Sequence, residues 1–365
     1  MRLPSDLLRR SAEEGSRLLA LAYLDEIGLA EGRLADPNDS EALHDFRVGL
    51  RRMRSCIKAY RSPLKGSVSK KVRGTLRDLT LSSNPGRDIE VQLDWLHRQA
   101  ERLGPGEIEG LAWLIGRLEG RKYESLDRVT DEIGQEFFRA TGKLRRRLGT
   151  FKMEVRTGRE AKPLSFGEVT GRLIQNSAAE LSDRLRVVTR PEQVSEAHTA
   201  RISAKRLRYL LEPLSHRTAG AKALVGRLKQ LQDVLGHLHD MQVISQEIES
   251  SLAALPRGAS DRPIVARPGL EALLGLAVSE AGNSFASFQA DWTHERAARF
   301  LIRANEFGKM LAGSAPPAKR EFTPAGATAK PEDNGNSAPN GQAPSEESQP
   351  ISLLRSHPPL QQPLR

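Results

Sequence analysis

Two stretches of the sequence, HDFRVGLRRMR from residue 44 and HTARISAKRLR from residue 198, combine histidine with arginine and lysine at helical spacing. On a helix that turns about 100° per residue, the cations of the first stretch fall in one stripe roughly 80° wide. This first cationic row consists of His44, Arg47, Arg51, Arg54 and Lys58. The same angles in the second stretch are taken by the second cationic row, His198, Arg201, Lys205 and Arg208. Guanidinium and ammonium groups are the usual partners of phosphate, and histidine adds a further donor.

An apolar stripe runs beside each cationic row and predicts that these helices pack against a core. It contains Leu43, Phe46, Leu50, Met53 and Ile57 in the first stretch and Ala197, Ala200, Ala204, Leu207 and Leu211 in the second. Like charges three or four residues apart repel by a few tenths of a kcal/mol per pair. Only one acid, Asp45, stands between His44 and Arg61, and it is off the row. Since the row would be roughly 21 Å long, it predicts a long, repetitively charged anion as the ligand.

The two rows belong to a longer internal repeat. His198 follows His44 by 154 residues, and each cation of the second row follows its counterpart by the same interval. The segments LRDLTLSSNPGRDIEV (76–91) and LKQLQDVLGHLHDMQV (228–243) align with an offset of 152. This alignment pairs Arg77 with Lys229 and Arg87 with His239, and the first one pairs Arg52 with Arg206. Two blocks in the same order predict a duplicated helical unit, and the long period indicates two bundles rather than a solenoid.

The segment SSNPGRD predicts a helix start beside the first row. Asn84 can cap the helix and Pro85 suits its first position, which places Arg87 in the first turn, where free backbone N–H groups favour anions. The repeat predicts an equivalent place for His239.

The elements that position these residues are helices throughout. Apolar residues recur at helical spacing up to about residue 313, and no alternating strand pattern is evident, so the fold class is predicted to be all-α. Glycines, a proline and mixed charges gather at 149–165 and indicate a joint. We therefore expect a first bundle at 1–150, a linker at 151–165, a second bundle at 166–313, and a disordered tail rich in proline, alanine and serine at 314–365.

Composition limits the partners and the compartment. The chain of 365 residues carries a net charge of +10, and the tail has five basic and five acidic residues, so this charge belongs to the folded part. An excess of this size favours an anionic partner. With one cysteine, Cys56, no internal disulfide can form. No apolar run approaches the roughly 18 residues of a membrane span, and the N-terminus lacks a secretory signal, which predicts a cytoplasmic protein without a membrane partner.

The repeated motifs resemble the CHAD family, the conserved histidine α-helical domain. They include HDFRVGLRRMR, the pair Arg87-Asp88, HTARISAKRLRY with Glu212 after it, and LKQLQDVLGHLHD, and the likeness covers residues from about 15 to 310. It implies two pseudo-symmetric four-helix bundles with a central basic groove or pore. It also implies binding of inorganic polyphosphate, with localisation at polyphosphate granules. Carried over by position, the ligand-binding residues would be both cationic rows with Arg87 and His239, flanked by Arg52, Arg206, Arg77 and Lys229.

Other classes of function have less support in the residues. Nucleic acid is the alternative partner, because any phosphate polymer would feel this charge. Aromatic residues, however, are only 5% of the chain, which leaves few platforms for base stacking. His237 and His239 face about 200° apart on one helix, so no metal site is expected. The chain has no phosphate-binding glycine loop, nucleophile elbow or acidic EXEXK motif, and we expect no catalytic residues, enzymatic activity or cofactor. A purely structural helical scaffold is the remaining alternative, and the sequence does not indicate the oligomeric state.

Overall fold

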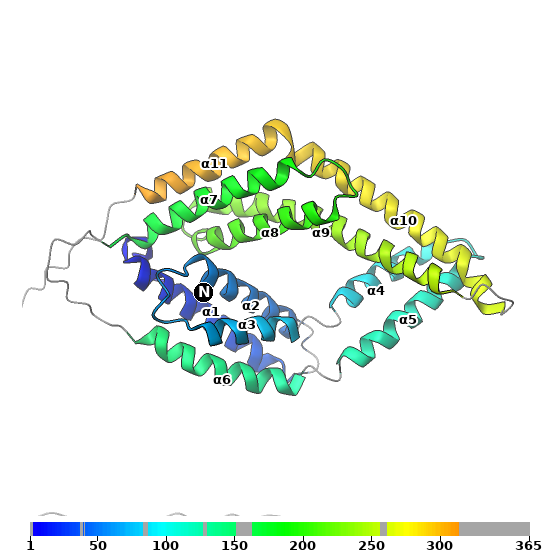
Figure 1. The fold of residues 1–365 in the computed structure, drawn as a ribbon, viewed down its shortest axis with the longest axis horizontal. Helices are drawn as coiled ribbons and strands as arrows, with labels where there is room; N and C mark the ends of the chain where they lie inside the picture. Colours follow the sequence, from blue (N-terminus) through cyan, green and yellow to red (C-terminus); the bar gives the residue numbers. More distant parts are fainter. Residues whose placement is uncertain are drawn as a thin grey trace, which may run out of the picture. The chain divides into compact units, whose positions relative to one another are not determined.

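The structure is a computed structural model that describes residues 3–36, 39, 41–82, 87–126, 130–150, 163–255 and 261–313. Within these ranges the chain forms eleven α-helices, three short 3-10 helices and no strand, so the all-α prediction is confirmed (Figure 1). The tail expected at 314–365 and residues 151–162 of the expected linker lie outside the described residues. None of the described helices has both the length and the apolar content needed to cross a membrane.

The helices divide between the two sequence halves. The first half contains α1 (Ala12–Arg33), α2 (Ala42–Ala59), α3 (Lys70–Ser82), α4 (Arg87–Gln99), α5 (Ile108–Leu126) and α6 (Thr130–Gly149). The second half contains α7 (Phe166–Arg186), α8 (Val194–Leu211), α9 (Ala219–Ala254), α10 (Asp261–Trp292) and α11 (His294–Ala312). The 3-10 helices are η1 (Leu7–Arg9), η2 (Ala100–Arg102) and η3 (Glu212–Leu214).

Several helix starts are encoded locally by polar caps. At α7 the Ser165 hydroxyl accepts a hydrogen bond from the Glu168 backbone N–H at 3.1 Å, and the Glu168 carboxylate accepts one from the Ser165 N–H at 2.7 Å. The Thr218 hydroxyl caps α9 in a similar way by accepting from the N–H of Ala221 at 3.2 Å. Such caps satisfy N–H groups that have no partner within the helix, so they define where each helix begins.

The expected helix start before His239 is wrong. In the first half, α3 ends at Ser82 and α4 begins at Arg87, and the predicted cap Asn84 and Pro85 lie outside the described residues. The second half has no proline at the equivalent place, and α9 continues through it as one helix of 36 residues. His239 therefore lies inside a helix, where the backbone N–H groups are already hydrogen-bonded and do not favour an anion.

The repeat seen in the sequence reappears in the way the helices pack. In the first half α1 contacts α2 and α6, and in the second half α7 contacts α8 and α11. Likewise α4 packs on α5 and α9 packs on α10 (Figure 1). Equivalent helices also meet across the halves, since α1 contacts α7 and α2 contacts α8. The contact between α2 and α8 brings together the two helices that carry the cationic rows.

Two hydrophobic clusters hold the helices together, and each takes residues from both halves. The larger cluster contains Phe46, Phe166 and Trp292, which are at most 1% exposed. The smaller cluster contains Trp95 of α4 and Ile244 of α9, at 1% and 0% exposed. Each cluster therefore joins helices of the two sequence halves. A helix of 36 residues is about 54 Å long, and along this length α9 contacts α8, α10 and α4.

Glycines allow a close helix crossing in the second cluster. A methyl group at Gly269 of α10 would collide with the Glu107 carbonyl oxygen and lie 2.8 Å from the Cα atom of Gly110 in α5. The neighbouring atoms belong to backbone, so they cannot move aside as a flexible side chain can. Any larger residue at Gly269 would therefore force α5 and α10 apart.

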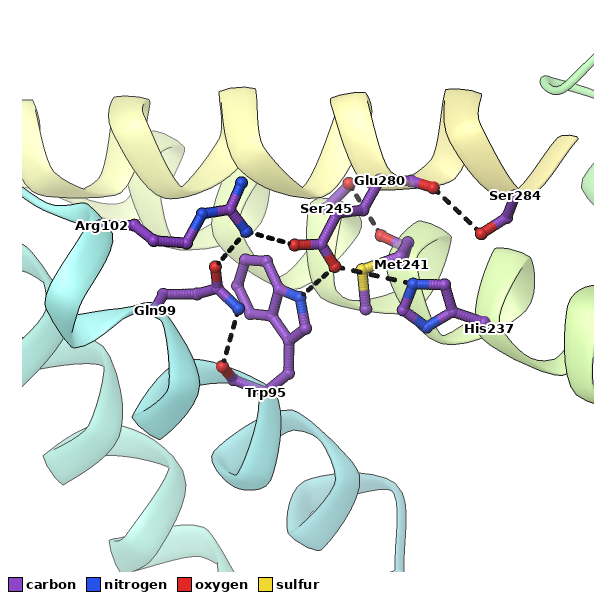
Figure 2. Close-up of polar contacts among 8 residues, drawn as sticks. All are labelled: Trp95, Gln99, Arg102, His237, Met241, Ser245, Glu280 and Ser284. Atoms are coloured by element: carbon purple, nitrogen blue, oxygen red, sulfur yellow. Dashed lines mark hydrogen bonds and ion pairs between the residues drawn. The ribbon is translucent and has the colours of Figure 1, made fainter. Parts of the chain in front are cut away.

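A partly exposed polar network lies beside the second cluster around Glu280 of α10 (Figure 2). Its carboxylate accepts hydrogen bonds from the Trp95 indole N–H at 2.9 Å and from Arg102 at 2.5 Å, and the ring of His237 lies 3.6 Å away. Burial by itself would raise the pKa of Glu280, but the bonds from Trp95 and Arg102 outweigh it and the pKa is lowered. The network thus joins α4, η2, α9 and α10 through one ionised carboxylate.

The Glu280→Gln substitution should lower the free energy of unfolding by about 1–2 kcal/mol, because it removes a charge-assisted bond and leaves Arg102 with its hydrogen bond to Gln99 but without its ion-pair partner. A carboxylate whose pKa is lowered by folding stabilises the fold above its unfolded pKa and loses this effect as the pH falls through the folded pKa. The difference between the variant and the wild type should therefore shrink in acid. Urea denaturation measured at several pH values tests this, with Glu271→Gln on the exposed face of the same helix as the control. Equal destabilisation by both changes would contradict it.

Candidate functional site

The helix α2 presents the first cationic row beside a buried apolar face. Phe46, Leu50 and Met53 are 0% exposed, and Ile57 is 3% exposed, so this face is held against the larger core. The first cationic row lies next to this apolar face on the surface of α2. On α8 the smaller residues Ala200 and Ala204 take the corresponding buried places.

Cations from both rows meet in one pocket of about 810 Å³, which we call the cationic pocket. Its basic residues are Arg51, Arg54, Lys58 and Arg61 from the α2 region, Arg73 and Arg77 of α3, and His198, Lys205 and Arg206 of α8. The other lining residues are Ser55, Ile57, Leu76, Thr80, Leu81, Ile202 and Tyr209. Within the described part of the chain, no aspartate or glutamate lines this pocket. An opening of this size, with charges of one sign, suits a polyanion.

Burial and electrostatic repulsion inside the pocket both act on Lys205. Burial lowers the pKa of this amine, and the nearby charges of Arg201, Arg51 and Arg208 lower it further, to about 8. Burial and the charge of Arg77 likewise lower the pKa of Arg54. Because Arg51 belongs to the first row and Lys205 to the second, the two rows are close enough to repel each other.

Two histidines lie together next to the cationic pocket. The ring centroids of His198 on α8 and His239 on α9 are 5.1 Å apart, with 49° between the ring planes. Burial lowers the pKa of His198, and the charges of His239, Arg201 and Lys205 add to this effect. His198 lines the pocket, whereas His239 is not among its lining residues. A bound anion would supply the negative charge that favours protonation of His198.

Seven of the residues predicted from the sequence line the cationic pocket: Arg51, Arg54, Lys58, Arg77, His198, Lys205 and Arg206. Arg206 also pairs with Glu180, at 2.9 Å. The flanking residue Arg52 instead forms an ion pair with Glu212 at 3.0 Å, and Arg208 approaches the second oxygen of the same carboxylate at 3.3 Å. Glu212 therefore links α2 to the end of α8 and holds two cations that the sequence suggested for ligand binding.

The remaining predicted residues lie elsewhere. Arg47 is buried, at 5% exposed, and His44 is half-buried, and neither lines the pocket. The guanidinium of Arg201 packs against Gly236 of α9, where a methyl group would be 3.4 Å from it, and its Nε atom has no hydrogen-bond partner among the described residues. Lys229 is exposed outside the pocket. Arg87 is the first residue of α4, and its side chain lies outside the described part of the structure.

Sequence reasoning missed two basic residues of the cationic pocket, Arg61 and Arg73. Arg73 lies one turn before Arg77 on α3, so the angular argument used for α2 could have found it. Arg61 follows the end of α2 at Ala59, where helical periodicity no longer predicts the direction of a side chain. Its position depends on the turn after the helix.

A family model described as the CHAD domain matches residues 19–249, more than half of the chain. The chain belongs to the CHAD domain family. The resemblance noted in the sequence is thus confirmed. Among solved structures, the CHAD domain from the plant Ricinus communis is 18% identical with a TM-score of 0.57, over 83% of this chain and 94% of that one. PptA from Streptomyces chartreusis is 15% identical with a TM-score of 0.59, over 78% of this chain and 99% of that one. Identities this low show a shared fold alone. A search of curated proteins found no match to the chain.

Proposed function

We propose that this CHAD domain protein binds inorganic polyphosphate in the cationic pocket and is not an enzyme. The observation that carries the proposal is the convergence of Arg51, Arg54 and Lys205 from two helices on one pocket without a lining carboxylate. The empty pocket is destabilised by repulsion, and a chain of phosphates would relieve it. A flexible polymer with one charge per phosphate can contact all three helices of the pocket in succession.

The pocket offers little for reading nucleic acid. Besides the His198 imidazole, Tyr209 is the one aromatic residue that lines it in the described ranges, and Tyr209 is 9% exposed, which leaves almost no phenol ring face for a base. Single-stranded nucleic acid gains about 1–3 kcal/mol per base from such stacking. Polyphosphate needs no stacking surface, so the geometry favours it over nucleic acid.

Calorimetry with polyphosphate and single-stranded DNA of matched charge tests this choice. We expect tighter binding of polyphosphate, an affinity that falls linearly with the logarithm of salt concentration, and a melting temperature that rises with the polymer. Equal affinity for the two polymers would overturn the assignment in favour of a general polyanion or nucleic-acid site.

The proposed function agrees with a symmetric arrangement of the two halves. We infer that the two halves are pseudo-symmetric four-helix units, in which α3 and α4 together correspond to α9, and that the pocket is part of a central basic groove. The repeated helix contacts support this reading. We further propose that the protein is cytoplasmic and gathers at polyphosphate granules, which fluorescence microscopy of a tagged protein in cells with and without polyphosphate would test.

The affinity for polyphosphate should fall by about tenfold between about pH 7 and pH 9, because Lys205 loses its proton near pH 8 in the empty pocket and must regain it to bind the anion. The stability of the ligand-free protein should change with pH in the opposite direction. Because folding lowers the pKa of Lys205, the folded state becomes more stable as the pH rises above about 8. Titrations across this range should show the loss in the wild type and not in Lys205→Arg, whose guanidinium stays charged. The same slope in both proteins would contradict the role of Lys205.

A further inference from the structure

Lys205 is a half-buried lysine of the cationic pocket that is surrounded by other cations. Its amine lines the pocket and is half-buried, and it has neither an ion pair nor a hydrogen bond to any described residue. Around it stand Arg201 and Arg208 of the same helix and Arg51 of α2. The pocket wall adds His198 and Arg206 of α8 and further arginines of α2 and α3.

These surroundings make the amine a nucleophile as well as an anion-binding group. An amine attacks carbonyl carbon only in its neutral form, and burial with neighbouring cations lowers the pKa of Lys205 to about 8. At neutral pH a much larger fraction of Lys205 is therefore neutral than of an ordinary lysine. Lys58 lines the same pocket but is exposed, so it lies among the same positive charges without the burial.

We propose that Lys205 is a site of covalent acylation by acyl phosphates, small anions that the pocket concentrates beside its amine. In this reaction the nitrogen lone pair forms a bond to the carbonyl carbon, and the bond from that carbon to the phosphate oxygen breaks. Phosphate leaves with the bonding electron pair, and the proton lost by nitrogen passes to phosphate or water. The products are an N-acyl lysine and inorganic phosphate, so no oxidant, reductant or further reactant is needed.

The neighbouring arginines fit both steps of this reaction. Their charge attracts the phosphate group of the reagent, and it stabilises the negative charge that develops on the leaving phosphate. A neutral acylating reagent would gain neither benefit. We therefore expect Lys205 to react preferentially with anionic acylating reagents, a preference that the reactivity of the amine alone would not produce.

Acylation would also regulate the pocket. It removes one positive charge where the two rows meet, so it should weaken polyphosphate binding, a consequence that rests on the proposed function. The modification itself does not, because it depends on the amine and its cations alone.

The test is incubation of the full chain with acetyl phosphate near pH 7.5, followed by mass spectrometry of each lysine over time. We expect Lys205 to be acetylated on the order of tenfold faster than Lys58 of the same pocket and the exposed Lys229. In the variant Arg54→Gln/Arg77→Gln, the rate at Lys205 with acetyl phosphate should fall several-fold, while the rate with the neutral reagent acetic anhydride should not fall. Acetylation of Lys205 no faster than that of Lys58 and Lys229 would overturn the proposal.

A separate titration distinguishes this proposal from the proposed function. Protein acetylated at Lys205 should bind polyphosphate several-fold more weakly than untreated protein, and unchanged affinity would overturn the regulatory consequence. Selective acetylation of a protein that does not bind polyphosphate at all would support the acylation site and refute the proposed function.

Discussion

The triple substitution Arg51→Gln/Arg54→Gln/Lys205→Gln should lower the affinity for polyphosphate by at least roughly 100-fold at about 0.15 M salt, since three charge-assisted phosphate contacts are lost. The slope of log affinity against log salt should decrease by about 2–3, or one unit or slightly less for each charge removed. The variant should also unfold at a higher temperature in the absence of ligand. All three residues line the cationic pocket, and burial and neighbouring cations lower the pKa values of Arg54 and Lys205.

A control variant with the same change in net charge distinguishes the effect of the pocket from the effect of the protein's overall positive charge. Arg184, Arg303 and Lys309 are exposed outside the pocket, and their replacement by glutamine should change affinity by less than about threefold. Calorimetry at several salt concentrations and thermal unfolding without ligand provide both readouts. Equal losses in the two triple variants would show that net charge alone, and not the pocket, binds the polymer.

The Gly269→Ala substitution should destabilise the fold by about 3 kcal/mol, because the added methyl group would meet the Glu107 carbonyl and the backbone of Gly110. The clash is with backbone of α5, so relief requires the α5–α10 crossing to open. In the same helix, a methyl group at Gly275 would meet nothing within 4 Å. Gly275→Ala should therefore stabilise the protein by about 0.5–1 kcal/mol, through the better helix propensity of alanine.

Urea denaturation of the two glycine variants checks this pair of predictions. The same glycine-to-alanine change in α10 should lower the free energy of unfolding at position 269 and raise it at position 275. If both variants gained stability, the close approach of α5 and α10 would be refuted. Polyphosphate binding provides a further readout: the cationic pocket is built from α2, α3 and α8, so Gly275→Ala should leave the affinity unchanged.

Much of the architecture could be read from local patterns. The helical periodicity predicted an all-α chain, and the duplicated motifs predicted the family, and both are confirmed. Angles on a helix depend only on spacing along the chain, so the placement of Arg51, Arg54 and Lys58 on one side of α2 needed no tertiary information. The expected helix start at His239 was wrong because the second half has no proline at the equivalent place, and α9 continues through it.

The sequence by itself determined that two helices carry matched cationic rows beside apolar faces, because both features depend on helical spacing alone. The tertiary structure decided which of these cations line the pocket and which are held elsewhere. Glu212 is 160 residues away from Arg52 along the chain, yet it accepts a hydrogen bond from it, and Arg47 is buried on the same helix that exposes Lys58. Helix packing brings such distant groups together, and this depends on contacts that no local spacing encodes.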